Sequence, residues 1–336
     1  MLILKNIKNF YTVLCLSFLV ISLALSNEKI SANDKNKWEL LEIKNVDEIP
    51  WDDRFRMGKA GSTNGKLLFF NPNGGALLYV KFNPGWDADG TEAHYHTFHE
   101  WGFVLDGSFP LYEFVSPNQK TGSLVNMEQG TFMDRPAFSI HGNRREAMKK
   151  QIITPASTQL IFYESGTTIS LDKDNKNFSE DWKNIDEFFP ANFQKSLDSS
   201  VMEWEDDKEL PGVKVKWLSD HGQKGFTAKL RYAPSNWKNK SSNTPTYNPN
   251  GYRFMYVLSG DMKIPVTSSY KDISIVNENS LIIHKPKSLW SWGEDKFTTQ
   301  GVMWLDVEYG NETTIGIKNI ERLPNCLLYT SDAADE

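Results

Sequence analysis

Two histidines and a glutamate lie close together in the sequence, at a spacing that suits metal binding. His94 and His96 are two residues apart, so on an extended strand both rings would lie on one face, because successive side chains alternate between faces. Glu100 follows four residues later and adds a carboxylate, and His141 supplies a third imidazole about a strand pair away. Three imidazoles and one carboxylate suit a single divalent metal ion: iron(II) is the expected metal, and manganese, nickel or zinc are the alternatives.

The patches that carry these residues resemble the two signature motifs of the cupin superfamily. The first motif places Glu and Gly at fixed distances after a His-x-His triplet, and it is matched by His94, His96, Glu100 and Gly107. The second runs from Gly through Pro to His, and it is matched by Gly130, Pro136 and His141. The resemblance implies a small β-barrel that binds its metal through the four side chains His94, His96, Glu100 and His141.

Two departures from the second motif concern the turn before its histidine. Phe138 stands where the family prefers Gly, and Asn143 follows His141 by two residues where the family's Asn follows by four. Neither departure removes a ligand. The shape of the turn at Phe138 is left open.

The chain also contains a two-fold internal repeat. Three positions of the first half recur about 150 residues later: Pro84 as Pro234, Gly107 as Gly260, and Pro136 as Pro286. Around them lie short segments rich in β-branched and aromatic residues, which indicate strands of a sandwich or barrel. Examples are 76–82, 159–164, 254–258 and 302–307. The sequence therefore predicts an all-β protein with two tandem cupin (double-stranded β-helix, or jelly-roll) barrels, a bicupin.

The predicted division is an N-terminal cupin with the metal site over 35–172, a linker with a short helix over 173–200, and a C-terminal cupin over 201–323. The second half lacks the ligands. At the positions of His94, His96, Glu100 and His141 it carries Tyr247, Pro249, Arg253 and Ser291. We therefore expect a degenerate second barrel, whose Trp290 and Trp292 are core residues. Its segment 210–218 also resembles, more weakly, the strand entry in the cupin-type domain of zinc anti-sigma factors.

The remaining histidines carry no motif. His99 has the opposite strand parity to His96 and is expected to point away from the metal. His221 and His284 are each isolated in the sequence and are interpreted as ordinary polar positions.

Both ends of the chain are expected to lie outside the fold. Residues 1–26 contain a short basic region, then an apolar run, then small residues at a potential cleavage site, which is the layout of a secretory signal peptide. An uncleaved membrane anchor is the alternative. We therefore expect a periplasmic or secreted protein with no stable membrane association after cleavage. Residues 326–336 have no link to the preceding pattern and look like a translated sequencing adapter, so we expect no structure there.

Composition excludes some partners. The net charge is −6 and no long block of one sign is present, which argues against nucleic acid as a partner.

A small organic molecule is the expected substrate, and a homodimer is an open possibility. Four protein ligands on an octahedral metal would leave two positions open, which favours an oxygenase of the dioxygenase type, with Glu100 also acting as a base. The alternatives are a metal-dependent isomerase, lyase or hydrolase, or a non-catalytic periplasmic module that binds or senses a small molecule.

Overall fold

Among the residues that the structure describes, short β-strands account for the regular structure, together with the 3-10 turns η2 (Val46–Glu48) and η5 (Ser199–Val201). A computed structural model describes residues between 41 and 310; its gaps of six residues or more are 55–62, 88–93, 115–122, 143–151, 171–194 and 240–245. No α-helix occurs among these described residues. The predicted all-β class is confirmed, and strands occur at all four segments that the sequence singled out.

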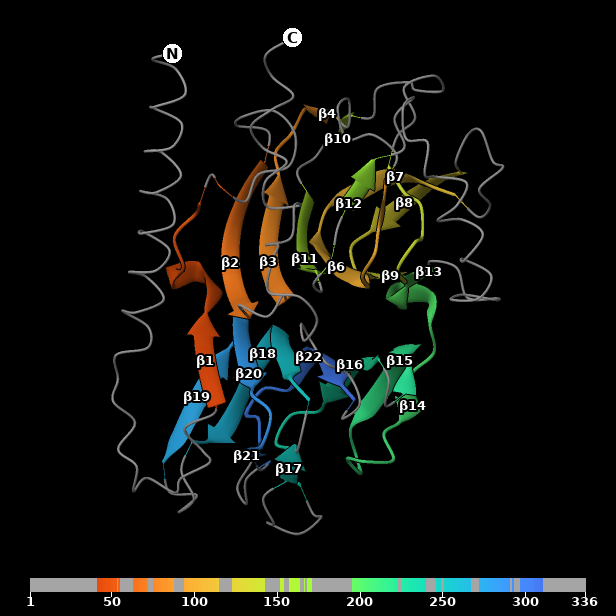
Figure 1. The fold of residues 1–336 in the computed structure, drawn as a ribbon. Helices are drawn as coiled ribbons and strands as arrows, with labels where there is room; N and C mark the ends of the chain where they lie inside the picture. Colours follow the sequence, from red (N-terminus) through yellow and green to blue (C-terminus); the bar gives the residue numbers. More distant parts are fainter. Residues whose placement is uncertain are drawn as a thin grey trace, which may run out of the picture. The chain divides into compact units, whose positions relative to one another are not determined.

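The first sheet has six antiparallel strands and carries Glu100 at the start of β6. Figure 1 labels its strands. Its spatial order is β13 (Lys195–Asp198), β9 (Thr131–Arg135), β6 (Glu100–Asp106), β11 (Ser157–Tyr163), β3 (Gly75–Phe82) and β2 (Thr63–Asn71). Three two-stranded ribbons complete this half: β4 (Trp86–Asp87) with β10 (Ile152–Ile153), β5 (His94–His96) with β12 (Thr168–Ser170), and β7 (Ser108–Glu113) with β8 (Ser123–Glu128).

The second sheet has eight strands in a matching order. It runs β1 (Leu41–Asn45), β20 (Ser280–His284), β18 (Arg253–Pro265), β22 (Val302–Tyr309), β16 (Phe226–Ala233), β15 (Lys214–Asp220) and β14 (Glu205–Asp206), while β19 (Ile273–Asn277) pairs with β18. A ribbon of β17 (Thr246–Asn248) with β21 (Ser288–Trp290) accompanies it. The order β9-β6-β11-β3 thus recurs as β20-β18-β22-β16, as expected for a duplicated barrel.

The two halves exchange one edge strand each, which the sequence did not predict. Strand β1 precedes the first half but pairs with β20, from Leu41 opposite His284 to Asn45 opposite Ser280. Strand β13 precedes the second half but pairs with β9 of the first. A 3-10 turn follows each exchanged strand, capped by the side chain of Asn45 or Asp198. The ranges predicted for the halves therefore do not describe this exchange, in which each sheet takes an edge strand from the segment that precedes the other half.

One hydrophobic core is shared by the two sheets. On the first sheet, alternate residues such as Trp101 and Phe162 enter it, and Phe254 and Tyr309 enter it from the second. The rings of Phe162 and Phe254 have centroids 5.4 Å apart, and the Trp101 indole N–H donates to the Tyr309 hydroxyl at 3.0 Å. We call this cluster the shared core. Because strand side chains alternate, the residues between these face the interior of their own barrel.

Each barrel has its own, separate interior cluster. Val80, Val104 and Ile161 belong to that of the first half, and Met255 and Trp304 to that of the second. Trp292 is buried in the second cluster as expected, while the side chain of Trp290 is not described.

Several predictions fall outside the described residues: the signal segment 1–26, the part of the predicted linker over 173–194 and the tail 326–336. The rest of the predicted linker, 195–200, forms β13 and the start of η5. Within the described part of the chain, no helix is long and apolar enough to span a membrane.

The shared core predicts that the two halves unfold as one unit. Phe162 is fully buried and its ring meets those of Phe69, Trp101, Phe254 and Tyr309. Phe162→Ala should therefore lower the free energy of unfolding by about 3–5 kcal/mol, measured by chemical denaturation. Hydrogen exchange should show lost protection in β18 and β22 as well as in β6 and β11.

A matched control is Leu124→Ala on β8, where the side chain is 56% exposed. It should change the free energy of unfolding by no more than about 0.5 kcal/mol. Loss of protection in Phe162→Ala that is confined to the first sheet would contradict a shared core.

Candidate metal centre

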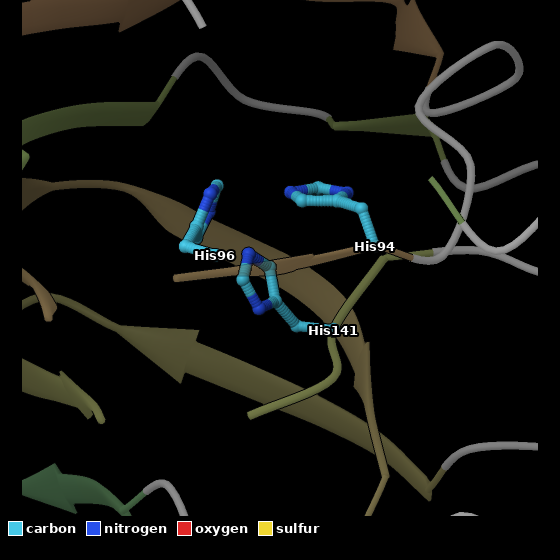
Figure 2. Close-up of side chains that lie close together, drawn as sticks. All are labelled: His94, His96 and His141. Atoms are coloured by element: carbon cyan, nitrogen blue, oxygen red, sulfur yellow. The ribbon is translucent and has the colours of Figure 1, made fainter. Parts of the chain in front are cut away.

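Backbone pairing brings the three motif histidines together. His94 and His96 are the two ends of β5, and His141 forms a bridge with His94: each backbone N–H donates to the other's carbonyl, at 2.9 and 3.1 Å. Figure 2 shows the three rings converging, and one ring nitrogen from each lies within 4.8 Å of the others. We call this set the histidine cluster. His96 and His141 are buried and His94 is partly exposed.

The ring orientations leave the Nε2 atoms of His96 and His141 facing the site. His96 Nδ1 contacts Thr168 Oγ1 at 2.9 Å, and His141 Nδ1 lies 3.3 Å from the Ser139 carbonyl oxygen. The buried His96 Nε2 makes no hydrogen bond. Holding the outer nitrogen of an imidazole while the inner one stays open is how proteins orient histidine ligands of metals.

Glu100 lies against two of the three rings. It begins β6, and its Oε2 is 3.4 Å from His96 Nε2 and 3.3 Å from His141 Nε2. It is not a member of the group whose ligand atoms all lie within 4.8 Å of one another, which contains only the three histidines. For metal bonds of about 2.1 Å, neighbouring ligand atoms are separated by about 3.0–3.4 Å. The separations of Glu100 from His96 and His141 therefore fit a shared ion.

Arg135 is a buried positive charge beside this carboxylate. It pairs across the β6–β9 ladder with Glu100, and its Nη1 is 3.4 Å from Glu100 Oε2. Its Nη2 is 3.8 Å from Glu113 Oε1, an oxygen that also accepts a hydrogen bond from Ser196. Arg135 Nε is buried and makes no hydrogen bond. The guanidinium is therefore held by long contacts. Sequence reasoning missed Arg135, Glu113 and Thr168, because no motif marks them.

The charges of the site favour a carboxylate at Glu100 and a neutral imidazole at His141. Burial raises the pKa of Glu100, but Arg135, His96 and His141 outweigh it and hold that pKa well below its usual value. Burial and then Arg135 and His94 lower the pKa of His141 well below its usual value. A neutral imidazole has a free lone pair, which a metal ligand requires. The donor set present thus fits a divalent metal.

The turn before His141 resolves the question that Phe138 raised. Phe138 takes a φ of 68°, the left-handed conformation that glycine adopts without strain. Its backbone N–H donates to the His96 carbonyl at 2.6 Å, which ties the turn to β5. The motif's turn is therefore kept without the glycine. Asn143 lies outside the described residues.

His99 points away from the histidine cluster, as its odd separation from His96 along the strand predicted. The interpretation of His221 as an isolated polar position was wrong. The Nε2 atoms of His99 and His221 lie 2.6 and 2.9 Å from the two carboxylate oxygens of Asp134. The two rings are 4.7 Å apart. Because 87 residues separate Asp134 from His221, no sequence spacing indicates this meeting.

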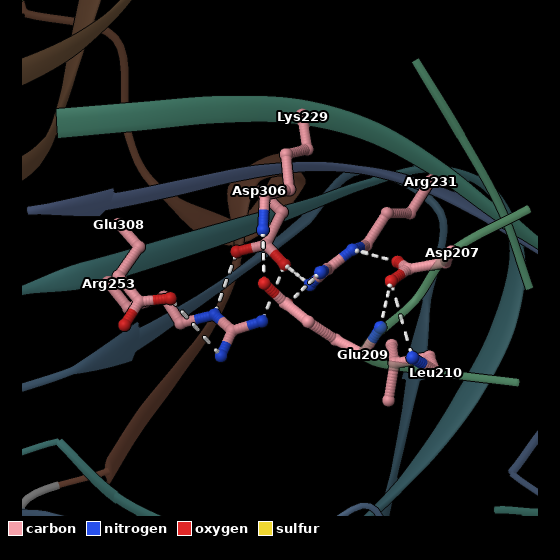
Figure 3. A network of polar contacts seen from close by, with 8 residues as sticks. All are labelled: Asp207, Glu209, Leu210, Lys229, Arg231, Arg253, Asp306 and Glu308. Carbon is pink, nitrogen blue, oxygen red and sulfur yellow. Dashed lines mark hydrogen bonds and ion pairs between the residues drawn. The ribbon is translucent and has the colours of Figure 1, made fainter. Parts of the chain in front are cut away.

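The second barrel holds an ion-pair network where the first holds the histidine cluster. Arg253 begins β18 as Glu100 begins β6, in agreement with the sequence count. It donates to Asp306 from Nε and Nη2 at 2.7 and 2.5 Å, and Asp306 also accepts from Arg231 (Figure 3). Asp207, Glu209 and Glu308 complete the set. We call it the arginine network.

The arginine network pairs a buried guanidinium with a buried carboxylate at the start of β18. Burial raises the pKa of Asp306, but Arg253 and Arg231 bring it well below its usual value. Burial also lowers the pKa of Arg253, and Asp306 and Glu308 outweigh that effect and raise it. Arg253 and Asp306 therefore each stabilise the charged form of the other. Tyr247 lies in β17 without a described side chain, and Pro249 and Ser291 lie outside the described residues.

Comparison with known proteins identifies the fold. No protein-family model matches the chain, and no curated protein sequence matches it. Among solved structures, a presumed dioxygenase from Nostoc punctiforme superposes with a TM-score of 0.57 at 13% identity, over 82% of this chain and 85% of that one.

Two oxalate decarboxylases superpose with a TM-score of 0.52 each. For a mutant of the Bacillus subtilis protein the identity is 12%, over 80% of this chain and 77% of that one. For the Lactobacillus farciminis protein, as a formate complex, the identity is 10%, over 80% and 86%. Together with the repeated strand order, these likenesses show that the chain has the bicupin fold.

Proposed function

We propose that the protein is a metal-dependent bicupin oxygenase of the dioxygenase type that acts on a small, anionic organic substrate at the first barrel. The observation that carries the proposal is the convergence of His94, His96 and His141, with the Glu100 carboxylate between the Nε2 atoms of two of them. The structural likeness to a presumed dioxygenase supports it.

The three histidines would hold the ion, and Glu100 would be the fourth ligand. When bound, such a metal supplies Lewis-acid and one-electron chemistry to a substrate in its open positions. The chain contributes the geometry: Thr168 and Ser139 hold the outer nitrogens of two rings. Phe98 stacks on His96 at 4.6 Å and belongs to the apolar interior of the barrel, which excludes water from that side.

Arg135 gives the reason to expect an anionic substrate. It is buried, and its contacts with Glu100 and Glu113, at 3.4 and 3.8 Å, are long for charge-assisted hydrogen bonds. An enolate, catecholate or carboxylate group can therefore compete for it. Once Arg135 pairs with the substrate, Glu100 loses its main stabilising partner, so its basicity rises. Glu100 can then take a proton from the bound substrate.

A second candidate function is a lyase that acts on a small carboxylate. Two of the structural neighbours are oxalate decarboxylases, and Arg135 beside Glu100 would serve a carboxylate substrate equally well. Oxygen uptake with β-diketones, flavonoids or hydroxy-aromatics would indicate the oxygenase. Release of carbon dioxide from oxalate without net oxygen uptake would indicate the lyase.

The histidine cluster predicts one metal ion that depends on its imidazoles. The double variant His96→Ala/His141→Ala should contain one equivalent of metal fewer than the wild type, because two of three nitrogen donors are gone. Elemental analysis of the purified proteins measures this. The matched control is His99→Gln/His221→Gln, which should retain the metal of the histidine cluster. Equal metal content in His96→Ala/His141→Ala and the wild type would refute the site.

A base role for Glu100 predicts a large loss of turnover in Glu100→Gln. The amide keeps the shape and an oxygen donor but has no basicity, so kcat should fall by about 10²- to 10⁴-fold at saturating metal. That loss corresponds to about 1.4 kcal/mol for each factor of ten. Metal affinity should fall only modestly, as measured by titration.

Glu113→Gln is the control for this effect. It removes the other buried carboxylate near Arg135 without touching an imidazole, so kcat should stay within about tenfold of the wild type. Full turnover in Glu100→Gln would exclude the base role and leave Glu100 as a plain ligand.

A further inference from the structure

A second group of potential metal ligands lies where the two halves meet. His99 and Asp134 come from the first half and His221 from the second, and their ligand atoms all lie within 4.8 Å of one another. Both rings point Nε2 at the same carboxylate, with His99 at 2.6 Å from Oδ1 and His221 at 2.9 Å from Oδ2. We call these three residues the His–Asp–His cluster.

Backbone contacts and packing hold this cluster in place independently of its own hydrogen bonds. The His221 backbone N–H donates to the Phe226 carbonyl at 2.9 Å, which fixes the chain after β15. The Phe226 ring supports both imidazoles, with centroids 4.8 Å from His99 and 5.1 Å from His221. Asp134 is fixed by its place in β9, opposite Trp101. The donors are therefore preorganised.

The cluster is separate from the histidine cluster. In the β6–β9 ladder Glu100 pairs with Arg135, and the next pair is Trp101 with Asp134. Since neighbouring pairs face opposite sides of a sheet, Glu100 and Arg135 enter the barrel while Trp101 and Asp134 face the second half. No residue belongs to both clusters.

We propose that His99 Nε2, Asp134 and His221 Nε2 bind a second divalent cation, such as Zn²⁺, that joins the two halves of the chain. Two imidazoles and one carboxylate are donors that zinc and nickel accept. With metal bonds of about 2.1 Å the donors would separate to about 3.4 Å, so the present N–O contacts would open by several tenths of an ångström. Binding at Nε2 requires that nitrogen to carry no proton, so a neutral ring bound in this way carries its proton on Nδ1.

Access and outer contacts also suit a cation. The side chains of His99 and His221 are 15% and 29% exposed while Asp134 is buried, so an ion can enter from the imidazole side and keep water as a fourth ligand. Ser219 Oγ donates to Asp134 Oδ2 at 2.5 Å and orients the carboxylate. The competing explanation is a purely hydrogen-bonded clamp between the halves, which needs no ion.

Zinc titration of the metal-free full-length protein tests the proposal. The wild type should bind two equivalents, read by calorimetry, and the second should raise the midpoint of thermal unfolding, because an ion that binds only the folded state stabilises it. His221→Gln and His99→Gln should each lose one equivalent and that rise in midpoint. His96→Ala/His141→Ala should lose the other equivalent and keep the rise.

Ser219→Ala is the matched control, because it removes a contact of Asp134 but no metal donor. It should keep the second equivalent with an affinity about tenfold weaker. A clamp predicts a different pattern: one equivalent in the wild type, a lower midpoint in His221→Gln whether or not zinc is present, and no zinc-dependent difference between the two proteins. That pattern would overturn the second site and leave the proposed function of the histidine cluster untouched.

Discussion

The shared aromatic core is the constraint on which the position of the candidate metal centre depends. Trp101 of β6 is held in that core by its ring contacts and by its hydrogen bond to Tyr309. A slip of one residue in β6 would exchange the two faces of the strand and place Glu100 among aromatic rings. Burying a carboxylate there without partners costs several kcal/mol. The core therefore fixes which side chains enter the barrel, and the chemistry follows from the residues on that face.

The two barrels carry opposite charges at the same inward position, a carboxylate in the first and a guanidinium in the second. In the first, Glu100 opens β6 beside two imidazoles, and Arg135 is its only full cationic partner within 4 Å among the described residues. In the second, Arg253 opens β18 and is matched by Asp306, which also binds Arg231. A saturated buried ion pair is stable but chemically inert, because removing either charge leaves the other unpaired. The first barrel, with loosely held charges and open nitrogens, is the one suited to a ligand.

The sequence predicts the local parts of this arrangement better than the distant ones. His94, His96, Glu100 and His141 could be found because strand parity and the resemblance to cupin motifs act over short stretches, and the bicupin fold followed from the repeat. The exchange of β1 and β13 could not be found, because both segments lie just outside the repeated core and carry only ordinary strand composition.

The meeting of His221 with Asp134 shows a second limit of sequence reasoning. Both residues are unremarkable in their own segments, and only the packing of one half on the other brings them within 2.9 Å. Phe138 illustrates the converse. Its side chain departs from the motif, yet the backbone N–H bond to His96 holds the φ of 68° that the motif's glycine would adopt freely. At Phe138 a tertiary contact overrides a local backbone preference, whereas at His221 and Asp134 it joins residues that have no local signal.

Strands β6 and β9 separate the interior of the first barrel from the second half, and each face of this strand pair carries its own polar residues. The successive pairs Glu100–Arg135 and Trp101–Asp134 share one hydrogen-bonded ladder but face opposite directions. The separation of Glu100 from Arg135, which sets the basicity of the carboxylate, is thus fixed by the same two strands that carry Asp134 towards the second half. A bound ion on the outer face would add a bond across the halves at that ladder. The inner site would then be held by the barrel and by its attachment to the neighbouring half, so the second barrel would contribute mechanically to the geometry of the first.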